Sequence, residues 1–167
     1  MKKFIKSIAI IGIIFSSLAS MNVMADEAVT TAPAGPTLYE RIGGEVGTRA
    51  IVEDVWANHT NNPIVKARFL YSDPVHVKQV VFEIFAAATG GGVEYTGMDL
   101  AERHSNMNIS EMEFNAVVDD IMAALTKNNI AQQEKDEVLA ILWSTRPVIV
   151  NTHLTTATLK KKAETEK

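Results

Sequence analysis

The sequence predicts an all-α protein, and three observations support this prediction. Apolar residues recur at the 3.6-residue spacing of one helix face in several separate stretches. No stretch shows the alternation of apolar and polar residues that a half-buried β-strand requires. Glycine, asparagine and proline, which end or interrupt helices, stand mainly between the apolar stretches. We therefore expect several amphipathic helices joined by short connections.

The first half of the predicted domain contains a short opening turn and two longer helices. Gly43-Gly44 ends the opening turn, and the apolar face that follows carries Ile51, Val52, Val55, Trp56 and His59. Asn61-Asn62-Pro63 ends this helix. The next face carries Val77, Val81, Ile84, Phe85 and Ala88. Gly90-Gly91-Gly92 then allows the chain to turn back sharply, because glycine adopts positive φ without strain.

The second half begins with a short polar helix that we expect to end near His104. A strongly amphipathic helix follows from Ser110, where Ser110 and Glu113 match the capping-box pattern. Its apolar face carries Phe114, Val117, Val118, Ile121, Met122 and Leu125. The face of a last helix carries Val138, Ile141, Leu142 and Thr145, and we expect Pro147 to disturb its C-terminal end.

The chain divides into four parts by composition. Residues 1–25 resemble a secretory signal peptide: Lys2, Lys3 and Lys6 precede the apolar run 8–15, and small residues at 23 and 25 suit a signal peptidase. Residues 26–36 are interpreted as a linker, 37–151 as the globular domain, and 152–167 as a charged, flexible tail. We expect export to a bacterial periplasm, with no membrane span after cleavage. An uncleaved anchor is the alternative, but the apolar run is short for a bilayer.

Composition excludes several classes of function. The absence of cysteine excludes disulfides, thiolate zinc sites, cysteine-held iron–sulfur clusters and covalent c-type haem attachment. A formal net charge of −4 gives no support for nucleic-acid binding. Phosphate-loop, nucleophile-elbow and zinc-protease motifs are missing. Asp119 and Asp120 are adjacent on a predicted helix and point in different directions, so we interpret both as solvated surface rather than an acid–base pair.

The four histidines are the remaining candidates for chemistry. His59 lies near a helix C-terminus, His76 lies at the exposed start of a helix, and His153 lies in the tail. One histidine does not make a zinc site. Haem iron, however, already has four porphyrin nitrogens and needs only one imidazole from the protein. His104, placed by the glycine run, suits such a role if an apolar slot surrounds it; the candidate walls are Trp56, Phe69, Val81, Phe85, Tyr95 and Val117.

Four segments together resemble the group I truncated haemoglobins: "TLYERIGGEVGTRAIVEDVW", "NPIVKARFLYSDP", "FAAATGGGVEYTGMDLAERH" and "ISEMEFNAVVDDIMAAL". The resemblance implies a two-over-two helical sandwich, the truncated globin fold, around a non-covalent haem b (iron protoporphyrin IX). It implies that His104 is the proximal iron ligand. The other haem contacts that it implies are Phe69 on the porphyrin face, Val77 and Val81 on the distal side, Val117 in the pocket wall, Tyr95 at the haem edge and His76 near a propionate.

One departure from the family pattern affects the expected chemistry. Many members carry a Phe-Tyr pair where this chain has Val55-Trp56, and the tyrosine donates a hydrogen bond to bound oxygen. Valines at 77, 80 and 81 occupy the usual distal glutamine or histidine positions. A hydrogen bond to a charged group contributes about 1.5–3 kcal/mol, or about one to two decades in affinity. We therefore expect faster oxygen release, unless the indole N–H of Trp56 reaches the ligand.

Three functions fit these observations. The first is reversible binding of oxygen, nitric oxide or carbon monoxide, as a carrier or scavenger. The second is a haem enzyme, either a nitric oxide dioxygenase served by a periplasmic reductase or a peroxidase-like protein. The missing distal tyrosine and the lack of a distal acid–base group count against this second function. The third is a helical periplasmic interaction protein without a cofactor.

Overall fold

The computed structural model describes residues 35–151, and within this range the secondary structure is helical. The helices are α1 (Leu38–Arg41), α2 (Gly44–Asn61), the 3-10 helix η1 (Lys66–Phe69), α3 (Pro74–Ala88), α4 (Leu100–His104), α5 (Glu111–Lys127) and α6 (Gln132–Ile149). The β-type pairing in these residues is a single isolated bridge between Ile109 and Val150. The all-α prediction is confirmed. None of the helices in residues 35–151 is long and apolar enough to span a bilayer.

The helix ends follow local side-chain chemistry. The Ser110 hydroxyl accepts a hydrogen bond from the Glu113 N–H at 3.2 Å, and the Glu113 carboxylate accepts one from the Ser110 N–H at 3.0 Å. The predicted capping box at the start of α5 is therefore confirmed. Pro147 lies inside α6, which continues to Ile149, so it does not end the helix early. A proline near a helix end removes a single N–H donor, and packing elsewhere along the helix compensates for this loss.

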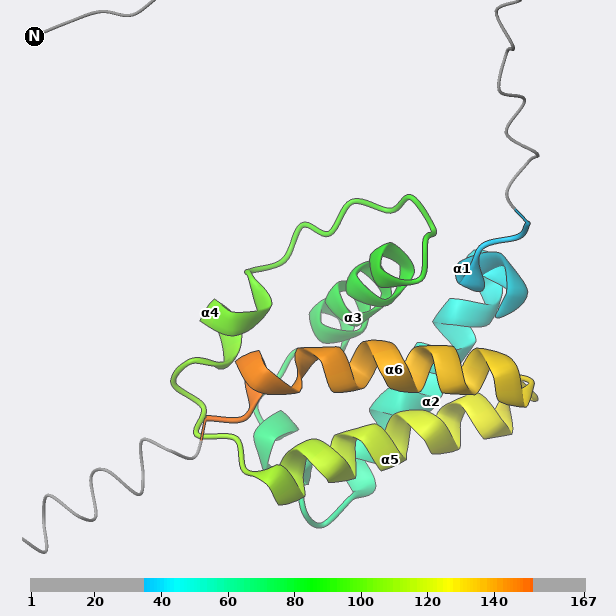
Figure 1. Ribbon diagram of the computed structural model, residues 1–167. Helices are drawn as coiled ribbons and strands as arrows, with labels where there is room; N and C mark the ends of the chain where they lie inside the picture. The colour runs from blue at the N-terminus through cyan, green and yellow to red at the C-terminus, as the bar shows by residue number, and fades with distance from the viewer. Residues whose placement is uncertain (1–34, 152–167) are drawn as a thin grey trace, which may run out of the picture. The chain divides into compact units, whose positions relative to one another are not determined.

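Two helix pairs form the sandwich shown in Figure 1. The first pair is α2 with α3 and the second is α5 with α6; α2 also packs on α5 and so joins the two layers. One core cluster includes Ile42, Ile51, Leu125 and Val138, each at most 2% exposed. Ile51, Leu125 and Val138 come from the apolar faces that the sequence predicts.

The glycine run reverses the chain after α3, as the sequence predicts. Gly90 and Gly92 have φ values of +87° and +64°, which side-chain-bearing residues rarely adopt. Gly91 lies against the ring of Tyr39, where a Cβ atom would stand 2.8 Å from the nearest ring carbon. The turn is thereby packed against α1, and the chain continues from it toward α4 (Figure 1).

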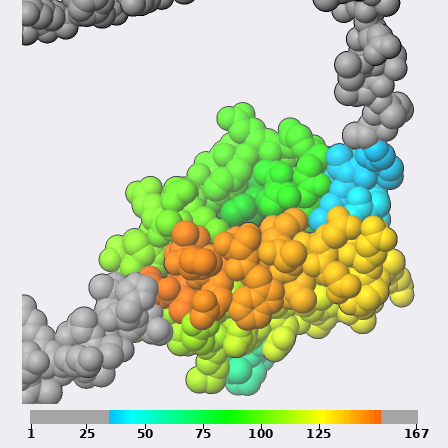
Figure 2. Space-filling model, viewed as in Figure 1, coloured from blue at the N-terminus to red at the C-terminus, as the bar shows by residue number. Residues whose placement is uncertain are grey.

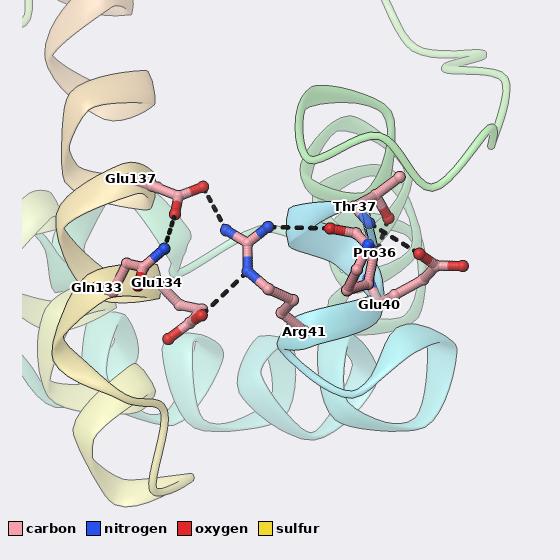
Figure 3. A network of polar contacts seen from close by, with 7 residues as sticks. All are labelled: Pro36, Thr37, Glu40, Arg41, Gln133, Glu134 and Glu137. Carbon is pink, nitrogen blue, oxygen red and sulfur yellow. Dashed lines mark hydrogen bonds and ion pairs between the residues drawn. The ribbon is translucent and has the colours of Figure 1, made fainter. Parts of the chain in front are cut away.

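Hydrogen bonds of Arg41 link α1 to α6, as Figure 3 shows. Its Nε donates to Glu134 at 3.0 Å, its second terminal nitrogen donates to Glu137, and the first donates to the carbonyl of Pro36 at 3.0 Å. The hydrogen bonds that Arg41 donates to Glu137 and Glu134 raise the pKa of Arg41, and the bond from Arg41 lowers the pKa of Glu137. This network joins the first helix of the domain to the last one.

Candidate functional site

His104 is the last residue of α4, where the sequence predicts the short helix to end. Its Nδ1 lies 2.7 Å from the carbonyl oxygen of Leu100, and since a carbonyl only accepts, Nδ1 is the donor. In the neutral imidazole this leaves Nε2 without a proton and with a free lone pair, which is the form that binds a metal. Asp99 caps the helix by accepting from the N–H groups of Ala101 and Glu102 at 3.0 and 3.1 Å. The ring therefore has a fixed tautomer and one nitrogen available.

Apolar side chains of α3 and α5 remain only partly buried around the core. Val77 and Val81 of α3 are half-buried, and Val81 packs on the buried cluster of Val52, Phe82 and Ala86. Phe85 of α3 and Val117 of α5 are also half-buried and pack against one shared cluster. Leaving apolar surface in water is unfavourable by about 25 cal/mol per Å². An apolar group that covers these side chains would recover that free energy, which is what the predicted haem contacts of Val77, Val81 and Val117 require.

Trp56 and Phe69 are brought together from α2 and η1. Their ring centroids lie 5.7 Å apart at an interplanar angle of 84°, an edge-to-face contact. Within residues 35–151 the indole nitrogen of Trp56 has no hydrogen-bond partner. Trp56 is therefore the one residue among those predicted for the distal side that offers a polar hydrogen.

His59 and Asp120 form a buried pair that the sequence did not predict. His59 is 7% exposed, stacks on Phe69 with centroids 5.2 Å apart, and donates from Nδ1 to Asp120 at 2.8 Å. Asp120 also accepts from the side chain of Asn62 at 3.0 Å. The interpretation of Asp119 and Asp120 as solvated surface is correct for Asp119, which is exposed, and wrong for Asp120, whose side chain is 14% exposed. Asp120 faces the end of α2, so a histidine and an asparagine from that helix end satisfy it.

The buried pair predicts how stability depends on pH. Burial lowers the pKa of His59 below its ordinary value of 6.5, and this outweighs Asp120, which raises it. In the unfolded chain His59 therefore binds a proton near pH 6.5, whereas in the native state it binds that proton only at lower pH. We expect the free energy of unfolding to be constant above about pH 7 and to fall as pH drops below about 6.5.

Denaturant unfolding of the haem-free chain at several pH values between 8 and 5 measures this dependence. His59→Gln keeps a donor near Asp120 but does not titrate, so its unfolding free energy should change much less across the same range. Carboxylates with lowered pKa values, such as Glu113, lose their contribution only at lower pH. Equal pH dependence in both proteins would contradict the role of His59.

Tyr95 anchors the connection between the glycine run and α4. Its hydroxyl donates to the carbonyl of Met98 at 2.7 Å, and its ring covers Gly97, where a Cβ atom would lie 2.4 Å from the hydroxyl oxygen. Thr96 next to it donates from its N–H and hydroxyl to Glu83 of α3, at 3.2 and 2.8 Å. Hydrogen bonds from Gln79 and Thr96 lower the pKa of Glu83. Together these contacts hold the connection that leads to His104.

Two further positions concern the edges of the site. His76 is exposed in the first turn of α3, which agrees with its expected surface setting. Arg68, which the sequence did not single out, donates from Nε to Glu113 and from a terminal nitrogen to the carbonyl of Met107, both at 2.8 Å. It links η1 to the turn after α4 and to α5. Nothing in the sequence around Arg68 indicates its contacts with Glu113 and Met107, which are distant along the chain.

The metal chemistry of the site rests on one histidine. Within the residues that the structure describes, no group of three or more histidine or carboxylate side chains could hold a metal ion. One available imidazole, partly buried apolar side chains on α3 and α5, and an aromatic pair at η1 fit a haem better than a bare ion. The fold and the site thus define a small helical haem protein.

Comparison with known proteins agrees with this class. The family model described as Bacterial-like globin matches residues 37–151. The chain belongs to this family. A group 1 truncated hemoglobin from Tetrahymena thermophila is 25% identical over 111 residues, 66% of this chain and 92% of the relative. One from Mycolicibacterium paratuberculosis is 26% identical over 113 residues, 68% and 83% of the two chains.

Solved structures support the same fold. The truncated hemoglobin of Tetrahymena pyriformis in its Fe(III) form has a TM-score of 0.67 and 24% identity, covering 70% of this chain and 99% of that chain. A group II truncated hemoglobin from Bacillus anthracis has a TM-score of 0.65 and 20% identity, with 71% and 94% covered. The two-over-two helical fold is confirmed. Family membership also confirms a haem-binding globin that takes diatomic gases and holds haem b without a covalent bond, so the interpretation without a cofactor is set aside.

Proposed function

We propose that this protein is an exported group I truncated haemoglobin that binds oxygen and nitric oxide reversibly in the periplasm, as a carrier or scavenger, with His104 as the iron ligand. The single observation that carries the proposal is the arrangement at His104. The bond from its Nδ1 to Leu100 leaves Nε2 free at the end of α4, a helix that packs on α6. When bound, the haem would supply the iron that takes up the gas, and His104 would hold that iron.

The distal side supports reversible binding rather than catalysis. Val77, Val80 and Val81 of α3 offer no hydrogen-bond donor, and Trp56 offers one. A donor-poor pocket stabilises charge on a ligand less, which favours release. The same feature disfavours peroxide chemistry, which requires a distal group that takes and returns a proton. A nitric oxide dioxygenase remains the second candidate, and it would require a reductase as electron donor.

Spectroscopy of the holoprotein tests the proposal. We expect a Soret band in the ferric protein that shifts on reduction and again under carbon monoxide. Oxygen should leave the reduced protein rapidly. A stable oxygen form that consumes nitric oxide in repeated turnovers, when a reductase is supplied, would favour the enzyme instead.

Trp56 variants test the donor-poor distal side directly. Trp56→Tyr introduces a hydroxyl donor, and we expect oxygen dissociation to slow by about 10- to 100-fold, since a hydrogen bond to a charged group contributes about 1.5–3 kcal/mol. Trp56→Phe is the matched control without a donor, and it should release oxygen at close to the parent rate. Stopped-flow measurements of oxygen and carbon monoxide dissociation separate a donor effect from a general change of the pocket. A more than tenfold faster release in Trp56→Phe would show that the indole already donates.

Export is the part of the proposal that rests on residues 1–25. These residues lie outside the described range, as do the linker up to residue 34 and the tail from residue 152. The basic start, apolar run and small residues support it. Fractionation of cells that express the full chain, with mass measurement of the product, tests it. A periplasmic product that begins at Asp26 is expected, whereas an intact chain in the membrane fraction would indicate an anchor.

A further inference from the structure

Asn151, directly after α6, is buried against the segment that carries His104. It is 8% exposed, although it lies next to the end of the domain. Its Nδ2 donates to the carbonyl of His104 at 2.7 Å and to that of Ser105 at 3.0 Å. Its Oδ1 accepts from the N–H of Ile109 at 2.7 Å, and its own N–H donates to the carbonyl of Ile109 at 3.2 Å. One residue thus makes four hydrogen bonds to the turn after α4.

α4, the helix that receives these bonds, depends on contacts from outside for its stability. α4 has five residues, and helices this short are unstable in isolation. The helix has no glycine C-cap, because Ser105 continues in a right-handed conformation. The Glu102 carbonyl accepts from the N–H and hydroxyl of Ser105, at 3.3 and 2.8 Å, and the His104 carbonyl accepts from the N–H of Met107 at 3.0 Å. The side chain of Asn151 adds a second donor to the His104 carbonyl and a donor to that of Ser105. It comes from a position 46 and 47 residues away in sequence from the two carbonyls that it caps.

The orientation of the imidazole depends on α4 remaining helical. The bond from His104 Nδ1 to the Leu100 carbonyl spans one helical turn, so it exists only while that turn is intact. α4 also packs on α6, and Figure 2 shows their surfaces in contact. Partners that orient a ligating histidine strengthen metal binding about 10- to 100-fold in other sites.

We propose that Asn151 is a positioning residue that fixes the iron-ligating histidine by capping α4 from the end of α6. The proposal rests on the proposed function, since it requires that His104 binds the iron. The hydrogen bonds of Asn151 go to backbone groups and not to the imidazole. Asn151 acts through the two carbonyls of His104 and Ser105 and through the amide of Ile109.

Asn151→Ala and Asn151→Asp test the proposal in the full holoprotein. Alanine removes all three side-chain bonds. Aspartate keeps the volume and the acceptor for Ile109 but loses the donor to His104 and Ser105, so it isolates the cap and remains informative if alanine prevents folding. Asn128→Ala is the matched control, because Asn128 donates from Nδ2 to the Ala124 carbonyl at the end of α5, at 2.9 Å.

Three measurements are compared: the iron–histidine stretching band in resonance Raman spectra, the rate of haem loss to a scavenger, and hydrogen exchange of the Ile109 amide in the haem-free chain. We expect both Asn151 variants to shift the band and to lose haem about tenfold faster or more. The amide should exchange faster in Asn151→Ala. In Asn128→Ala the band should be unchanged and haem loss within about threefold of the parent.

The outcomes separate this inference from the proposed function. If the Asn151 variants and Asn128→Ala give the same band and the same rate of haem loss, the positioning role is overturned, while ligation by His104 stands. If the band is absent from the parent, or survives in a His104 variant, ligation by His104 fails and the inference fails with it.

Discussion

Replacing His104 with glycine is expected to abolish the histidine-ligated spectrum of this protein. The ring provides the one available imidazole in α4, so its removal leaves the iron without a protein ligand and should weaken haem binding by about 100-fold or more, the upper range for changes near a metal. Adding free imidazole should restore the iron–histidine band, because the cavity left by the side chain can accept it. Titration with haem and resonance Raman spectroscopy measure both effects.

His76→Gly is the matched control for this experiment. His76 is exposed in the first turn of α3, and its replacement removes a histidine without changing the ligand. Its iron–histidine band should equal that of the parent, because the propionate contact that the resemblance implies for His76 does not involve the iron. Survival of the band in His104→Gly without added imidazole would contradict the assignment of the ligand.

Removing Asp120 is expected to produce the second large effect. Asp120→Ala leaves the Nδ1–H of His59 and the side-chain amide of Asn62 without their acceptor in a mostly buried position. Each buried donor left without a partner costs about 1–3 kcal/mol. For the two donors together we therefore expect the free energy of unfolding to fall by about 2–6 kcal/mol. Because His59 stacks on Phe69, the same change should disturb the aromatic pair with Trp56 and accelerate haem loss.

Asp119→Ala provides a control one position away on the same helix. Asp119 is exposed, so its replacement should change the free energy of unfolding by no more than about 0.5 kcal/mol. Urea unfolding of the haem-free chains measures the difference between the two variants. Equal stability of Asp119→Ala and Asp120→Ala would show that the buried pair contributes nothing.

The helices and their ends were predictable because their causes are local. The apolar face of α5 and the reciprocal bonds of Ser110 and Glu113 lie within a few residues of one another. The same holds for the glycine turn after α3 and for the end of α4 at His104. The resemblance to truncated haemoglobins supplied the fold and the haem, which periodicity alone did not provide. The roles that stay predictions are iron ligation by His104 and haem contact by Trp56, Phe69, His76, Val77, Val81, Tyr95 and Val117.

What the sequence did not predict depends on contacts between distant residues. Asp120 pairs with a histidine 61 positions away, and neither residue shows this in its own neighbourhood. Arg68 and Met107 are 39 positions apart, and Asn151 stands more than 40 positions from each group that it binds in the turn after α4. Helix packing determines all three contacts. A single sequence therefore predicts the elements well and the polar links between them poorly.

Because Asn151 lies near the end of the domain, the site around His104 is completed only late in the synthesis of the protein. His104 leaves the ribosome well before residue 151, and until then the carbonyls of His104 and Ser105 lack the donor that Asn151 supplies. A nascent chain that has reached only the middle of α6 carries the proposed ligand without the residue proposed to position it. The proposed role of Asn151 therefore implies that haem reaches its final geometry only after the whole domain has been translated.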